Sequence, residues 1–412
     1  MQSVEKQETQ TNRPVIRRSF LQSLGVDIQL LTLIVALVGV WILFQIWSEG
    51  IFLTPRNLWF LSIQTAVVGI MVGGMVLVIV ARQIDLSVGS VLGFTAMIMA
   101  LLQALQPLGQ GWPWVIALIV GVLVGVLIGA FNGYMSAYWG VPAFVVTLAG
   151  MMVFRNGTFS VSGFTISPLN ETFQIIGGGN NGSIGGLWTW VFGIALSAYV
   201  IWQAVTARSR RIRNGFEVRP MWAEVLVAAV TVFIIIGFVM VMNSYPIPGS
   251  DPPVPAGIPV PVLIALAVLG FLNWMTRATR FGRYIYAIGG NPEAALLAGI
   301  NVKQMMVYIF MLMGFLTGIA AAVQAARLNA ATPTVGRDLE LTVIAGAVIG
   351  GTVLSGGAGT IIGAALGALL MSSLENGLGL VGVKTEQQKI YIGIVLLLAV
   401  LWNTVTNKRR RA

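Results

Sequence analysis

The chain has 412 residues, of which 57% are hydrophobic and only 9% charged, with a net charge of +10 and a mean hydropathy of +0.86. Soluble domains carry roughly 25% charged residues, so this composition excludes an ordinary soluble fold. Cysteine and histidine are both absent, which excludes disulfides, thiolate metal sites and catalysis by a histidine general base.

Apolar segments long enough to cross a bilayer, about 20 residues each, recur along the chain. They predict an all-α, polytopic transmembrane bundle of about 10–12 spans occupying residues 29–405. The segments 88–106 and 341–355 are short or glycine-rich enough to be broken or re-entrant. In chain order the predicted spans are 29–47, 58–80, 88–106, 114–135, 144–162, 187–206, 222–242, 260–276, 305–326, 341–355, 360–377 and 388–405.

The positions of the basic residues orient these spans. Eighteen of the 24 basic residues fall on one side of the predicted topology, as the positive-inside rule requires of the cytoplasmic side. Residues 1–28 and 406–412 are therefore predicted to be cytoplasmic tails, and the first tail has no cleavage site of a signal peptide. The eighteen are Lys6, Arg13, Arg17, Arg18, Arg82, Arg208, Arg210, Arg211, Arg213, Arg219, Arg277, Arg280, Arg283, Lys303, Lys408, Arg409, Arg410 and Arg411.

The sequence contains no convincing nucleotide-binding motif. No GxxxxGK[ST] motif occurs, so ATP must be handled by another protein. The one GxGxxG pattern, Gly177, Gly179 and Gly182, lies in a polar loop and is read as chance. The proline-rich outer loop 243–261 is expected to be extended, and no polar segment is long enough to fold as a separate domain.

Polar residues near span ends are the candidates for a pathway or a gate. Asp85 can cap the following "DLSVGS" helix and hold a gating arrangement, or simply cap it with a local ion pair to Arg82. Ser87 is a further candidate. Asn132 and Asn376, each followed by glycine, either bond between helices or border the pathway, because unpaired amides are costly in lipid.

Charged residues are otherwise rare in the spans. Arg155, Glu340 and Glu375 fall near predicted membrane edges, where a functional role competes with snorkelling or surface exposure. Ion-coupled carriers usually need carboxylates within the membrane, and no convincing mid-span example occurs. The glycine-rich stretch 348–368 predicts close helix packing, with a break lining a pathway as the alternative.

The stretch "GGNPEAALLAGIN" (289–301) predicts a short helix with marked ends within the cytoplasmic loop 277–304. Asn291 suits the N-cap, Pro292 the first turn and Glu293 the positive end of the helix dipole. Gly299 suits the left-handed residue that ends a helix. Such a helix either docks into another protein or lies on the lipid surface.

"EAALLAG" resembles the EAA-x3-G signature of ABC importer permeases, although the leucine and proline of its longer form are missing. "IDLSVGS" (84–90), "NGYMSAYWGVPAFVVTLAG" (132–150), "TRFGRYIYAIGGNPEAALLAGINV" (279–302) and "VIGGTVLSGGAGTIIGAALGA" (348–368) are similar to the permeases of pentose and hexose importers. The middle insertion, 207–261, most resembles that of xylose transporter permeases.

This resemblance implies a transport subunit in the bacterial inner membrane, and no enzyme. It would import a neutral monosaccharide, with D-xylose the first expectation and galactose, ribose or arabinose the others. Its coupling helix would comprise Glu293, Ala294, Ala295 and Gly299. The expected partners are an ATP-binding cassette subunit, an extracytoplasmic sugar-binding protein, a second copy of the chain and membrane lipid, but no nucleic acid. The chain itself would bind no cofactor or metal. A proton-coupled sugar carrier is the main alternative, followed by a passive channel.

Overall fold

The computed structural model describes residues 28–105, 107–179, 182–216 and 218–411. Within these ranges the chain forms helices and loops, with isolated bridges such as Ile166–Ala331 in place of strands. The all-α prediction is confirmed. The predicted N-terminal tail lies outside the described residues up to position 27.

Nine helices of the described chain are long and apolar enough to cross a membrane. They are α2 (Ile28–Trp47), α3 (Pro55–Val80), α5 (Trp114–Tyr138), α6 (Ala143–Val161), α8 (Gly185–Arg213), α9 (Met221–Asn243), α10 (Val260–Ala278), α13 (Val302–Leu328) and α15 (Ile361–Leu380). The other elements are α4 (Val88–Gln103), α7 (Glu171–Gln174), η1 (Ile175–Gly177), α11 (Arg280–Gly290), α12 (Pro292–Leu297), α14 (Leu339–Ile349) and α16 (Thr385–Arg411).

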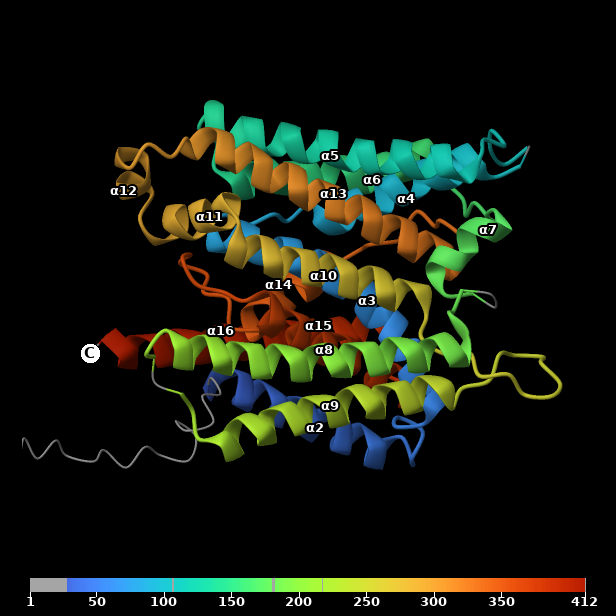
Figure 1. The fold of residues 1–412 in the computed structure, drawn as a ribbon. Helices are drawn as coiled ribbons and strands as arrows, with labels where there is room; N and C mark the ends of the chain where they lie inside the picture. The colour runs from blue at the N-terminus through green and yellow to red at the C-terminus, as the bar shows by residue number, and fades with distance from the viewer. Residues whose placement is uncertain (1–27, 106, 180–181, 217, 412) are drawn as a thin grey trace, which may run out of the picture.

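The long helices run side by side, so the bundle has two ends (Figure 1). One end carries α11, α12 and the C-terminus, and the other carries α7 and the loop that follows α9. The last turn of α8, with Arg210, Arg211 and Arg213, lies at the first of these ends. Because positive residues are retained in the cytoplasm, we assign this as the inner end and the opposite one as the outer end.

Two of the twelve predicted spans are not continuous helices. The helix α4 has 16 residues and α14 has 11, about 24 and 17 Å at 1.5 Å per residue, against a hydrocarbon core of about 30 Å. Non-helical segments, 81–87 and 329–338, precede them. Each non-helical segment together with the helix after it, 81–103 and 329–349, still connects opposite ends of the bundle (Figure 1). These two stretches are therefore broken crossings and not re-entrant loops. These are the two segments that the sequence marked as broken or re-entrant.

The broken crossings belong to an inverted repeat. The helices α3 to α6 recur as α13 to α16, and the starts of α3 and α13, like those of α5 and α15, lie 247 residues apart. The two sets run in opposite directions through the bundle. At the centre, Gly89 faces the carbonyl oxygen of Gly336 and Gly336 faces that of Gly89, so the beginnings of α4 and α14 meet. Repeats of this kind place solute sites near their common interface.

Helix α3 is the central element, with 89% of its most apolar window buried. On one side α5 crosses α13 at glycine contacts, with Gly125 against Gly314 and Gly129 against Phe310. Small residues let helix backbones approach closely where lipid supplies no hydrophobic driving force. By contrast, α8 and α9 are only 11% buried. The insertion that forms the end of α8 and all of α9 therefore adds a peripheral helix pair.

The glycine-rich stretch also packs closely, as predicted. Gly346 and Gly350 at the end of α14 lie directly against the backbone of α15 at Gly367 and Gly363. Between the two helices, residues 351–360 leave the helical conformation, and Gly357 donates a hydrogen bond to the carbonyl oxygen of Val80 at 2.9 Å. This loop therefore closes the inner end of α3.

Candidate functional site

Helix α12 has the ends that its sequence predicts. The side chain of Asn291 accepts hydrogen bonds from the backbone nitrogens of Glu293 and Ala294, at 3.0 and 3.1 Å. Gly299 has a φ of +82°, and Ile300 donates to the carbonyl oxygen of Ala295 at 3.0 Å. That pair of features is the Schellman motif, which terminates a helix. The helix therefore holds its shape through local bonds.

The exposed surface of α12 differs from an alanine face. Ala295 is buried, whereas Leu296 is 63% and Leu297 is 89% exposed. Glu293 and Ala294 are exposed as well. Two neighbouring leucines at the inner end of the bundle form an apolar surface without a partner in the described chain. Sequence reasoning missed these leucines, because only the packing of Ala295 shows which side of so short a helix faces outward.

Helix α11 anchors α12 to the rest of the protein. Its residues Ile285, Ile288 and Gly289 are buried. The hydroxyl of Tyr286 donates to the carbonyl oxygen of Gly359 at 2.7 Å. Burial raises the pKa of Tyr286, opposed by the positive charge of Arg277, so this hydroxyl stays a protonated donor near neutral pH. The α11–α12 unit is thereby tied to the loop that follows α14.

A second tie comes from Arg82, which follows the end of α3. Its Nε donates to the carbonyl oxygen of Gly289 at 2.7 Å, and its Nη2 to that of Gly290 at 2.6 Å. These carbonyls end α11, where the negative end of the helix dipole favours a cation. Arg82 therefore forms no ion pair with Asp85, and the local pair considered as one reading of the sequence is not formed. Arg82 instead joins α11 to the first broken crossing.

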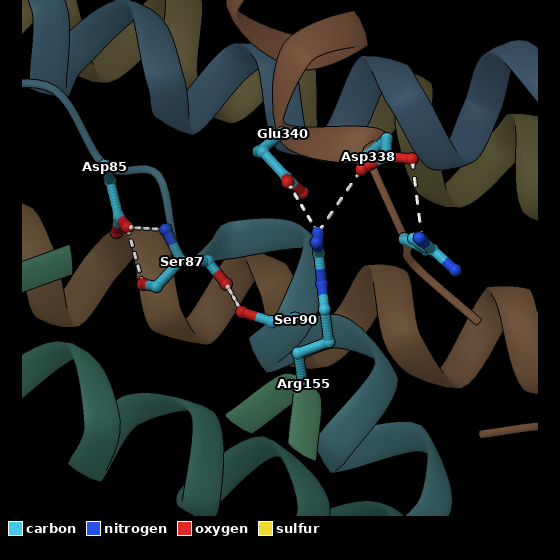
Figure 2. A network of polar contacts seen from close by, with 7 residues as sticks. Asp85, Ser87, Ser90, Arg155, Asp338 and Glu340 are labelled. Atoms are coloured by element: carbon cyan, nitrogen blue, oxygen red, sulfur yellow. Dashed lines mark hydrogen bonds and ion pairs between the residues drawn. The ribbon is translucent and has the colours of Figure 1, made fainter. Parts of the chain in front are cut away.

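Asp85 lies inside that crossing and is buried. It accepts hydrogen bonds from the backbone nitrogen of Ser87 at 2.8 Å and from the Ser87 hydroxyl at 2.6 Å (Figure 2). The hydroxyl of Ser87 in turn accepts from the amide of Asn132 on α5 at 3.2 Å. Thr147 of α6 bonds to the backbone of Ile84 and Leu86. The structure thus brings three predicted candidates together as the support of the break before α4.

A charged cluster stands beyond the start of α4. Arg155 of α6 donates to Glu340 of α14 at 2.8 Å and contacts Asp338 at 3.5 Å (Figure 2). Glu340 is only 3% exposed. Arg155 lies about 18 Å along α6 from its inner end at 1.5 Å per residue. Of the alternatives that the sequence left open, surface exposure does not hold for Glu340. Sequence reasoning could not pair two charges on distant helices.

Asn376, the remaining predicted candidate, lies elsewhere, near the outer end of α15. Its side chain accepts from the amide of Asn57 at 2.9 Å and donates to Gln64 at 3.5 Å, both on α3. The neighbouring Glu375 accepts from Thr342 at 2.8 Å and pairs with Lys389 at 3.4 Å. Asn376 and Glu375 line a cavity of about 440 Å³. Asn376 therefore both bonds between helices and borders a cavity.

No group of His, Cys, Asp or Glu that could hold a metal ion occurs among the described residues. Four elements remain as the functional candidates. They are the exposed helix α12, the Arg82 link, the broken crossings with their polar supports, and the polar cavity at the outer end.

Comparison with known proteins agrees with this arrangement. Residues 57–400 match the family described as the permease component of the branched-chain amino acid transport system. The chain is 37% identical over 388 residues to the xylose transport system permease protein XylH of Haemophilus influenzae, covering 94% of this chain and 98% of that protein.

Further relatives include XylH of Escherichia coli K12, 39% identical over 93% of this chain and 94% of that protein. The ribose import permease protein RbsC of the same organism is 33% identical over 87% of this chain and 88% of that protein. No solved structure matches the chain.

Proposed function

The chain belongs to the family of branched-chain amino acid transport system permease components, and from this premise we propose that it imports D-xylose into the bacterial cytoplasm. It is the membrane-spanning permease of an ABC importer of the sugar-transporting kind, and it is not itself an enzyme. The observation that carries the choice of xylose is the identity of 37–39% with two xylose permeases over almost their whole length. Ribose is the second candidate, supported by the lower identity of 33% with RbsC.

The proposed assembly has an ATP-binding subunit at the inner end. Helix α12 would enter a groove of that subunit, with Leu296 and Leu297 as its apolar contact and Glu293, Ala294 and Gly299 around them. A sugar-binding protein would deliver the substrate to the outer loops, and a second copy of the chain would complete the pathway. The exposure of Leu296 and Leu297 supports the first of these contacts. A solvated loop has no need of such apolar exposure.

The Arg82 link would pass the motion of α12 into the bundle. A displacement of α11 and α12 acts on the carbonyl oxygens of Gly289 and Gly290 and so on Arg82. From there it reaches the segment 81–87, whose position is held by Asp85, Ser87 and Asn132. The break before α4 is the place where the crossing can bend. Nucleotide binding by the partner thereby biases a two-state pore without any chemistry in this chain.

Proton coupling has less support. Glu340 is neutralised by Arg155, and the carboxylate of Asp85 is held by two hydrogen bonds from Ser87. Neither residue lines the cavity, and Glu375, which does, accepts from Thr342 and pairs with Lys389. A proton-coupled carrier needs a carboxylate that is free to exchange protons. The polar interior of the described chain therefore favours a neutral solute and an external source of energy.

Uptake by reconstituted vesicles tests the proposal. Proteoliposomes holding this chain with its ATP-binding subunit are given the sugar-binding protein loaded with radiolabelled D-xylose. We expect D-xylose uptake to require ATP in the aqueous compartment that α12 faces. We expect ribose to compete only weakly with this uptake. Uptake by this chain alone under a proton gradient would refute the ATP-driven mechanism. ATP-driven uptake of ribose but not xylose would refute only the choice of sugar.

A further inference from the structure

A cavity of about 440 Å³ opens near the outer end of the bundle, between α3, α13, α15 and the start of α16. Its polar lining comes from Gln64, Gln324, Arg327, Ser372 and Asn376, with Glu375 and Gln388 beside them. Its size lies within the range of about 300–1,000 Å³ that is usual for small-molecule sites. Helices α3 and α13 are the corresponding first helices of the two repeats, so the cavity lies at the repeat interface.

The cavity reaches inward from the outer end. Gln64 lies nine positions after the start of α3, about 14 Å along that helix. Arg327 belongs to the last turn of α13 and Asn376 to the final turns of α15. At the rim, Gly379 and Leu380 are exposed. The lining thus runs from the exposed opening at Gly379 and Leu380 to the amide of Gln64, which lies deeper in the bundle.

Two polar groups in the lining of the cavity have no hydrogen-bond partner among the described residues. Ser372 is 1% exposed, and its hydroxyl has no hydrogen-bond partner in the described part of the chain. The same holds for the Nε of Arg327. Buried polar groups without partners are rare in native proteins, because each has lost its hydrogen bonds to water without a replacement. A polar guest in the cavity supplies the missing partners.

The chemistry of the lining selects the guest. Amides dominate, and each offers a donor and an acceptor that can bond to two neighbouring hydroxyl groups. Glu375 is already engaged by Thr342 and Lys389, so it leaves no free negative charge for a cation. Val67, Val68 and Leu339 provide an apolar wall for the C–H surface of a sugar ring. This combination suits a neutral polyhydroxylated ring better than a cation, which would need a free carboxylate.

We infer that this cavity is the outward-facing binding site for the monosaccharide, with Gln324, Arg327 and Ser372 as ligand-contacting residues. The inference rests on the proposed function for the choice of a sugar. It goes beyond that function by naming the place where the sugar first meets the membrane subunit. Asn376 is held by Asn57 and Gln64, and so it fixes the wall of the site.

The natural absence of cysteine allows a direct test in the full chain. Gln324→Cys and Ser372→Cys each place one thiol in the cavity, and Ser244→Cys places a matched thiol on the exposed outer end of α9. Each variant is reconstituted with the ATP-binding subunit and treated from outside with a membrane-impermeant maleimide. Labelling is timed with and without D-xylose, and with L-leucine as a comparison solute.

We expect D-xylose to slow labelling at both cavity positions, by a factor of about ten when its concentration is ten times its Kd, and to leave Ser244→Cys unchanged. A variant is scored when it co-purifies with the ATP-binding subunit as a single species, which shows that it is folded. No labelling from outside, no protection by D-xylose, or protection by L-leucine alone would each overturn the inference. Because ATP-driven uptake by the unsubstituted chain is measured in parallel, these outcomes leave the proposed function standing. Protection without any ATP-driven uptake in the unsubstituted chain would instead support the cavity and refute the transport mechanism.

Discussion

Arg82 holds the carbonyl oxygen of Gly289 at 2.7 Å across 207 residues of sequence. This contact joins the break in the first repeat to the helix that presents α12 at the inner end. The cation lies on the carbonyl end of α11, with a second bond to Gly290, so displacement of α11 displaces Arg82 as well.

Replacing Arg82 should separate ATP hydrolysis from transport. In Arg82→Ala both hydrogen bonds are lost, and bonds to a charged group contribute about 1.5–3 kcal/mol each. We expect D-xylose uptake to fall at least about tenfold, which corresponds to about 1.4 kcal/mol, while the partner's ATPase activity persists. Arg82→Lys should recover part of the uptake, because an ammonium cannot match the planar fork. Arg213→Ala, exposed at the end of α8, is the control; loss of uptake there too would contradict a specific role for Arg82.

A charge on the exposed leucine pair should prevent binding of the ATP-binding subunit. Leu297 is 89% exposed, so Leu297→Asp should change the stability of the permease by only about 0.5 kcal/mol and yet abolish co-purification of the partner. Leu105→Asp, at an exposed leucine of the outer end, is the matched control and should co-purify normally. Equal recovery of the partner with both variants would exclude α12 as the docking helix.

The end of α12 should depend on glycine at position 299. Gly299 has a φ of +82° and an open space around its α-carbon, so Gly299→Ala adds no clash but strains the backbone by about 1 kcal/mol. We expect ATP-driven uptake to fall as the last turn of α12 loosens. Gly290→Ala meets no neighbour and requires no left-handed backbone, so it should transport normally. Uptake is the measurement for both, and identical rates would show that the shape of α12 does not matter.

Breaking the Arg155–Glu340 pair should cost more than breaking an ion pair whose carboxylate is less buried. Arg155→Ala leaves Glu340 buried without its cation, and losses of about 3–5 kcal/mol are usual in that situation. Arg155→Ala combined with Glu340→Gln should recover much of the loss, since the unpaired charge is gone. Thermal unfolding in detergent provides the measurement. Arg208→Ala breaks the Arg208–Glu224 pair, whose carboxylate side chain is 21% exposed against 4% for Glu340, and should cost less; a loss as large as that of Arg155→Ala would contradict the argument.

Much of the fold could be predicted from the sequence. The long spans follow from hydropathy, because a bilayer requires about 20 apolar residues and satisfied backbone groups. Helix α12 follows from Asn291, Pro292 and Gly299, since caps act within a few residues of the helix end. In the sequence, the two broken crossings were indicated only by the shortness of their apolar segments and by their glycine content. The repeat between "SVGS" (87–90) and "TVGR" (334–337) was a signal that the sequence reading missed.

The candidate site depended more on tertiary structure. Asp85, Ser87 and Asn132 were identified as polar residues near span ends, but their shared network needs α5 to pass beside the break before α4. The pairing of Arg155 with Glu340 spans 185 residues, and composition carries no information about it. The exposed leucines of α12 were missed for the same reason, because exposure is decided by what packs against Ala295.

By itself, the sequence determined where most of the long apolar helices lie, which end of the bundle carries the positive charge, and where α12 begins and ends. These features depend on solvent and on contacts between near neighbours, so a linear pattern is enough to specify them. Only the tertiary structure decided that Arg82 meets Gly289, that the two broken crossings meet at Gly89 and Gly336, and that amides from separate helices share one cavity. Such contacts arise when small residues let distant backbones pack together, and the partner of each residue is then set by the whole arrangement of helices.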